Sequence, residues 1–179
     1  MTKHIIGILL ATVIMFVFGA GYWLSPIGAG ALKGSTDDAA AQAALAEYFP
    51  EPGSYFVPSP GSDPETFSAL HEKGPVATVH VSSGTPPMQT GVFVKGFVHE
   101  LITVILIAAL LQMAAPALGS YVSRVGFVLL AGVAASLWVN GNNVIWWSVP
   151  MGFPIAVFVY DVLAWTLVGL VLAKTVRET

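Results

Sequence analysis

The sequence contains no cysteine and very little charge, and each shortage excludes several classes of protein. Without cysteine there is no disulfide, no thiolate zinc site, no cysteine-ligated iron–sulfur cluster and no cysteine nucleophile. Charged residues make up 9% and hydrophobic residues 55% of the 179 residues, whereas a globular protein has about 25% charged residues. Such a chain has too little polar surface to cover itself in water, which indicates a membrane protein.

Basic residues and catalytic motifs are scarce as well. The seven Lys and Arg residues are scattered and the net charge is -3, so no basic stripe is present to neutralise a phosphate backbone, and nucleic-acid binding is excluded. There is no G-x-S-x-G elbow, phosphate-binding loop or H-E-x-x-H motif. A haem held by two intramembrane histidines would need a partner chain, because His99 is the only histidine inside an apolar run. We therefore expect no catalytic residues, no metal site and no cofactor.

Four apolar runs are long enough to cross a bilayer, whose core of about 30 Å requires about 20 residues of helix. They predict transmembrane helices at residues 1–24, 92–114, 121–140 and 154–174. The run from Ile5 to Leu24 is longer than the apolar region of a signal peptide, which favours an uncleaved anchor, with Gly19-Ala20-Gly21 as the alternative cleavage site. Asn140-Gly141-Asn142-Asn143 predicts a turn after the third helix, and Pro154 favours the start of the fourth.

The distribution of basic residues predicts the orientation. An even number of spans puts both termini on one side, and Lys3, Arg124, Lys174 and Arg177 would all lie on that side. Because cytoplasmic loops carry an excess of Lys and Arg, both termini should be cytoplasmic and residues 25–91 should lie outside. Aromatic residues at the outer ends of the runs would form a belt at headgroup level: Tyr22, Trp23, Trp138, Trp146, Trp147 and Phe153.

Residues 25–91 predict a small α+β cap that packs on the membrane face. Ser35 or Thr36 is expected to cap a helix that ends at Pro50, and Asp63-Pro64-Glu65 to open a second helix through His71. The segments 54–57 and 76–81 have the pattern of short strands that could pair. His71 and His80 are interpreted as solvated polar residues, because neither belongs to a cluster with metal-ligand spacing. The expected fold class is thus an all-α membrane protein of four transmembrane helices, with an α+β periplasmic cap between helices 1 and 2.

Three ionisable residues lie inside the apolar runs and form, with a threonine, a candidate polar layer. His99, Glu100 and Thr103 share one side of the second run, and Asp161 lies at a similar depth in the fourth. Because a charge inside a span costs about 2.5 to 3.5 kcal/mol, such residues face protein or water. They could act as a proton relay, a cation site or a substrate contact. The simpler interpretation, which we favour, is that they hydrogen-bond between helices for about 1 kcal/mol.

Other residues suggest an interface with a second membrane protein. The tryptophans Trp138, Trp146 and Trp147 follow or flank the predicted Asn-rich turn, where they could anchor the chain in the headgroups or form a docking surface. Gly132 and Ser136 have the four-residue spacing that lets helix backbones approach closely, either within the chain or between two copies.

Several short motifs carry a resemblance across most of the chain. They are Phe18-Gly19, Trp23-Leu24-Ser25-Pro26, Gly53-Ser54-Tyr55-Phe56-Val57-Pro58, Gly74-Pro75-Val76-Ala77, Arg124-Val125-Gly126-Phe127 and the pair Trp146-Trp147. In these motifs the chain resembles a group of short uncharacterised bacterial four-span inner-membrane proteins. The resemblance implies a bacterial inner membrane, and it implies no activity, cofactor or site residue.

Taken together, the residues predict an accessory or structural subunit without catalysis. Its partners would be the lipid bilayer and either other membrane subunits or a second copy of itself. The alternative is a small proton- or ion-coupled transporter that uses His99, Glu100 and Asp161. Transporters often break their helices near the midplane, whereas the Gly and Pro breaks of this sequence lie at the ends of the spans, which favours the accessory role.

Overall fold

The computed structural model describes residues 2–175, and four long helices dominate it. They are α1 (Thr2–Leu24), α5 (Thr90–Ala114), α6 (Tyr121–Trp146) and α7 (Gly152–Leu172). Each is long and apolar enough to cross a membrane, as the four apolar runs predict. Arg177, one of the basic residues assigned to the inner side, lies outside the described residues.

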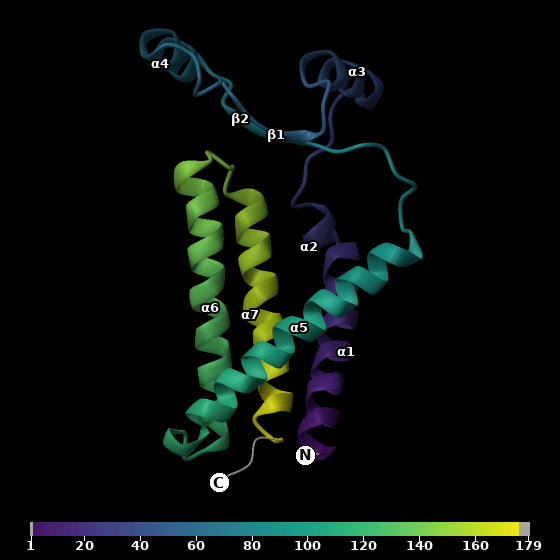
Figure 1. Ribbon diagram of the computed structural model, residues 1–179, viewed down its shortest axis with the longest axis vertical. Coiled ribbons are helices and arrows are strands. Elements are labelled where there is room, and N and C mark those ends of the chain that lie inside the picture. The colour runs from purple at the N-terminus through teal and green to yellow at the C-terminus, as the bar shows by residue number, and fades with distance from the viewer. Residues whose placement is uncertain (1, 176–179) are drawn as a thin grey trace.

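The helices form an open bundle with α7 between α6 and α1. α5 crosses this row obliquely and packs mainly against α1 (Figure 1). The C-terminal part of α5, continued by the 3-10 turn η1 (Ala115–Ala117), reaches the start of α6, whereas its N-terminal part extends away from α6 and α7. The start of α1 and the end of α7 lie at one end of the bundle, here called the terminal end, and the segment between α1 and α5 lies at the opposite, cap end.

The buried aliphatic core lies in the half of the bundle nearest the terminal end. Small residues let the helices approach there: a Cβ added at Gly169 would lie 3.2 Å from the backbone oxygen of Val125, so α7 sits directly against α6. All four helices contribute side chains to this core, which includes Ala11, Met15, Val104, Ile107, Ala108, Leu111, Val128, Ala164, Val168 and Leu172. Close packing is the main attraction available between helices in lipid, where burial of an apolar side chain gains little.

The expected turn at residues 140–143 is wrong, because α6 continues through it to Trp146. Asn140 donates from Nδ2 to the backbone oxygen of Ser136 at 3.0 Å, and Asn142 donates to that of Trp138 at 2.6 Å. The amide side chains therefore bond to carbonyls one turn earlier on the same helix and do not redirect the chain. The chain turns instead after Trp146, where Ser148 has a positive φ of 54°.

The fourth helix also begins earlier than Pro154. α7 starts at Gly152, so Pro154 lies in its first turn, where a backbone N–H has no partner within the helix and its absence costs little. The second helix likewise begins at Thr90 rather than at residue 92.

The cap contains three short helices and one hairpin. α2 (Pro26–Ala29) follows α1 directly, and α3 (Asp38–Tyr48) and α4 (Pro64–Lys73) flank the strands β1 (Gly53–Val57) and β2 (Ala77–Val81). The strands pair antiparallel with Tyr55 opposite Val79, so the expected pairing is found.

The capping residue of α3 differs from the expected Ser35 or Thr36. Asp37 is the N-cap, and its carboxylate accepts from the backbone N–H of Ala40 at 3.0 Å. Ser35 instead hydrogen-bonds the side chain of Asp38. Aspartate is as good an N-cap as serine, and only the backbone conformation decides which candidate is used.

Apart from α2, which follows α1 and packs on its end, the hairpin is the part of the cap that contacts the helical bundle closely. The Thr78 hydroxyl donates to the backbone oxygen of Trp147 at 3.2 Å, and the rings of Phe56 and Trp147 meet edge to face with centroids 6.2 Å apart. α3 and α4 contain no buried residue and stand away from the bundle (Figure 1). The expected packing of the cap on the membrane face is therefore limited to α2 and the hairpin.

Candidate functional site

The predicted polar layer is divided between two places in the bundle. Tyr160 and Asp161 are neighbours on α7, so their side chains leave the helix about 100° apart. Asp161 points to α6, where it accepts a hydrogen bond from Ser136, whereas Tyr160 points to α1 and stacks on Phe18. Glu100 lies on the Tyr160 side, because the two residues line one cavity and Asp161 does not line it. Glu100 and Asp161, for which residue counting predicts a similar depth, therefore have different surroundings.

Asp161 is held in a polar chain between α6 and α7. Its Oδ2 accepts from Ser136 Oγ at 2.6 Å, and the same Oγ accepts from Asn140 Nδ2 at 3.0 Å. Ser136 is only 5% exposed, so this chain is shielded. The buried Ser136 hydroxyl and the partly buried Asp161 carboxyl make a hydrogen bond between two helices, which is the kind of contact that the simpler interpretation expects.

Gly132 and Ser136, the candidate interface on α6, both serve this contact inside the chain. A Cβ added at Gly132 would lie 2.1 Å from Cγ of Trp165, so the indole ring of α7 lies directly on the glycine. Ser136 lies one turn further along the same face. Neither residue is open to a second chain, because both are buried.

Glu100 has a carboxyl oxygen without a partner. Its Oε2 is buried and makes no hydrogen bond within the described part of the chain. The carboxyl lines a cavity of about 280 Å³ whose walls come from α1, the start of α5, and Tyr160 of α7. An unpaired carboxyl oxygen next to apolar walls is costly, and such a group is a functional candidate by default.

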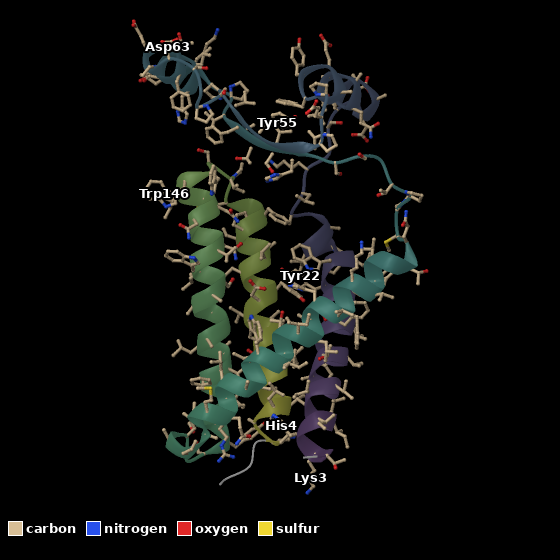
Figure 2. The ribbon with its side chains drawn as sticks, viewed as in Figure 1. Lys3, His4, Tyr22, Tyr55, Asp63 and Trp146 are labelled. Atoms are coloured by element: carbon tan, nitrogen blue, oxygen red, sulfur yellow. The ribbon has the colours of Figure 1, made fainter. Side chains whose placement is uncertain are left out.

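Aromatic rings form the wall of this cavity that faces α7. The rings of Tyr160 and Phe18 are stacked with centroids 5.7 Å apart, and Trp23 contacts Tyr160 at the same distance. Tyr22, which is buried near the middle of the cap-end half (Figure 2), donates from its hydroxyl to the backbone oxygen of Ala156 at 2.7 Å. Ring contacts and this hydrogen bond fix the position of Tyr160 against α1.

The positions of Tyr160 and Asn140 have little signature in the sequence. A tyrosine in an apolar run is usually a packing residue, and an asparagine next to glycine favours a turn. One sequence signal is Gly19 in the first apolar run, since small residues in spans mark places where a neighbouring helix approaches closely. In the structure a Cβ at Gly19 would lie 3.0 Å from the Tyr160 hydroxyl.

His99 and Thr103 belong neither to the polar chain of Asp161 nor to the residues that line the Glu100 cavity. His99 is exposed on the outer side of α5, one residue and about 100° from Glu100. The Thr103 hydroxyl donates to the backbone oxygen of His99 at 2.9 Å, within its own helix. His99, Glu100 and Asp161 therefore form no connected relay in this arrangement.

The three tryptophans of the candidate interface have two different environments. Trp138 and Trp146 are 74% and 71% exposed, and Trp146 projects from α6 away from the other helices (Figure 2). Trp147 instead contacts the hairpin through Phe56 and Thr78. The first two are placed for lipid headgroups or a partner, and the third holds the cap.

A second cavity, of about 350 Å³, lies between the hairpin and the end of α6. Ser54, His80 and Asn143 contribute polar groups to it, and Ser54 Oγ lies 2.9 Å from Nδ1 of His80. The pair is exposed, as was expected for His80. Among the described residues no group of three His, Asp or Glu side chains could hold a metal ion.

Comparison with family models, with curated proteins and with solved structures found no match for this chain. Its own geometry therefore carries the functional argument.

Proposed function

We propose that this chain is an accessory or structural subunit of the bacterial inner membrane, which acts through contacts with other membrane proteins and performs no catalysis. One observation carries the proposal: the ionisable His99 is exposed on a helix long enough to span a membrane. Ionisable residues in spans normally face protein or water, because exposure to lipid is costly. A partner that covers His99 would remove that cost.

The surface around His99 supports the same proposal. Along its first half α5 packs mainly on α1, with Tyr160 of α7 near Glu100, and its opposite side is uncovered (Figure 1). Val98, His99 and Ile102 are exposed on this side, which we call the α5 outer face. Apolar residues beside a polar one give a partner helix both a packing surface and a hydrogen bond.

The proposed orientation has both termini in the cytoplasm and residues 25–91 in the periplasm. Lys3 and Lys174 lie at the terminal end with Arg124, and the acidic cap lies at the other end, which agrees with the positive-inside rule. Reporter fusions test it. A fusion after Thr179 should report from the cytoplasm and one near Gly61 from the periplasm, and either opposite result would overturn the orientation.

The alternative function, a small proton- or ion-coupled transporter, receives less support. A proton path needs polar groups in contact or bridged by water, but Asp161 bonds Ser136 and His99 points outward. The Glu100 cavity alone does not cross the bundle, since its lining residues all belong to the cap-end half.

Photocrosslinking tests the accessory role directly. A benzophenone amino acid at His99 should give a discrete protein–protein product in membranes, whose mass separates a second copy from another subunit. The same group at Leu130, which is 69% exposed on α6, is the control and should give lipid adducts only.

Two substitutions then test whether the His99 side chain itself binds the partner. His99→Gln keeps a hydrogen-bonding side chain and should retain the partner during mild-detergent purification, whereas His99→Leu should lose it. Recovery as a lone monomer, with only lipid adducts at His99, would count against the accessory role.

A further inference from the structure

The cavity beside Glu100 has the composition of a ligand site rather than of a packing defect. Among its lining residues are four aromatic rings, Phe16, Trp23, Phe93 and Tyr160, and one carboxyl group. No basic side chain lines it. A packing defect in a membrane protein would be lined by aliphatic side chains, and a half-buried carboxyl at its wall would be unfavourable.

The walls of the cavity are held in place by contacts that do not depend on a ligand. Phe16 meets Phe97 edge to face with centroids 5.6 Å apart, which joins α1 to α5 on one side. Trp23 contacts Phe153 and Tyr160, which joins α1 to α7 on the other. A preformed site loses little entropy when it binds a small molecule.

The chemistry of the lining selects a cation. The faces of aromatic rings attract ammonium groups, and cages of such rings recognise organic cations in other proteins. Glu100 is the one ionisable carboxylic acid among the lining residues, and an ammonium group would supply the opposite charge to its carboxylate. A neutral apolar molecule would leave the carboxylate without a counter-charge.

We infer that this cavity binds a small organic cation, with its ammonium group against the Glu100 carboxyl and its apolar body between the aromatic rings. The inference goes beyond the accessory role and does not depend on it. Entry is from the cap end, where Leu24 and Met88 line the cavity and are 75% and 68% exposed. A volume of about 280 Å³ can hold a molecule of roughly the size of an arylalkylamine.

Binding of 2-phenylethylammonium to the full chain in lipid nanodiscs tests the inference. Its neutral counterpart, 2-phenylethanol, has the same ring and tail and serves as the matched probe. Isothermal titration should show saturable binding of the ammonium compound above that of empty nanodiscs, and at least tenfold weaker binding of the alcohol.

Two isosteric variants locate the site. Glu100→Gln keeps the size of the side chain and removes its charge, so it should weaken binding of the ammonium compound at least tenfold and leave that of the alcohol nearly unchanged. Asp161→Asn is the same chemical change at a similar depth outside the cavity, and it should bind as the unmodified chain does. Ala20→Phe, which fills the cavity from α1, should abolish binding of both probes.

Each remaining outcome overturns the inference. Equal affinity for the two probes would make the cavity an apolar pocket for lipid chains. Unchanged binding in Glu100→Gln, or an equal loss in Asp161→Asn, would place the cation elsewhere. Absence of saturable binding to the unmodified chain would mean that no such site exists.

Discussion

The two halves of the bundle are packed by different kinds of side chain. Near the terminal end, aliphatic residues of all four helices form the core, with Leu111 and Leu172 fully buried, and a hollow of about 390 Å³ lies at its edge between α1 and the end of α7. Near the cap end, α5 diverges, and aromatic rings and polar side chains take the place of that core around the Glu100 cavity. The difference indicates that aliphatic packing stabilises one half, whereas the other half is free to hold polar groups.

The largest effect is expected from adding one methyl group where α6 and α7 touch. In Gly132→Ala the new Cβ would meet the ring of Trp165 at 2.1 Å, and a ring packed between helices has little room to move. We expect a loss of about 3 kcal/mol of unfolding free energy, measured by denaturation in mixed micelles. Gly126→Ala is the control on the same helix, because nothing lies within 4 Å of its added Cβ. Equal behaviour of the two variants would contradict this packing.

The aliphatic core gives the next largest effect. Leu111→Ala should cost about 2 kcal/mol, since it leaves a cavity in a closed core, while lipid removes most of the usual transfer contribution. Leu110→Ala, at a neighbouring position that is 49% exposed, should cost far less. The same unfolding measurement compares them, and similar losses would mean that the terminal-end half is not the more tightly packed one.

The polar chain between α6 and α7 should contribute less. Asp161→Leu removes the acceptor of Ser136 and should lose about 1 kcal/mol, whereas Asp161→Asn keeps an oxygen that can accept the hydrogen bond and should unfold nearly as the unmodified chain does. Loss of partner binding or transport in a stable, fully assembled Asp161→Asn protein would instead show that ionisation matters.

The smallest effect on stability is expected at α4, which has no buried residue and is stabilised locally by its N-cap residue, Asp63. Hydrogen bonds from the backbone N–H and side chain of Thr66 lower the pKa of Asp63 below its usual 3.8. Because the folded pKa is the lower one, the stabilisation of α4 is present above pH 3.8 and is lost as the pH falls through the lowered value.

Nuclear magnetic resonance of the Thr66 amide measures this effect. Its chemical shift should titrate with a midpoint below that of an unstructured aspartate, and Asp63→Asn should remove the transition. A midpoint at the ordinary value would show that the N-cap hydrogen bond between Asp63 and Thr66 does not form in solution.

The number of long helices and most elements of the cap could be predicted because their signals are local, whereas the four-residue α2 has no periodic pattern and was not expected. An apolar run such as Ile5–Leu24 specifies a long helix by length alone, and Asp63-Pro64 marks the start of α4 through a cap and a fixed φ. The pairing of two short strands followed from their patterns and the short chain between them. The predicted turn at Asn140 is wrong because an asparagine amide can either stabilise a turn or bond to a carbonyl one helical turn earlier, and the sequence near it does not decide between the two.

The sequence could not predict whether the polar side chains contact one another. Residue counting gave Glu100 and Asp161 similar depths, because rise per residue is fixed along a helix. Which way each side chain faces depends on the rotation of its helix and on the oblique path of α5, and both are set by packing among distant residues. The sequence alone therefore determined where along its helix each residue lies, while the tertiary structure decided that Glu100 lines a cavity with Tyr160 and that Asp161 bonds to Ser136.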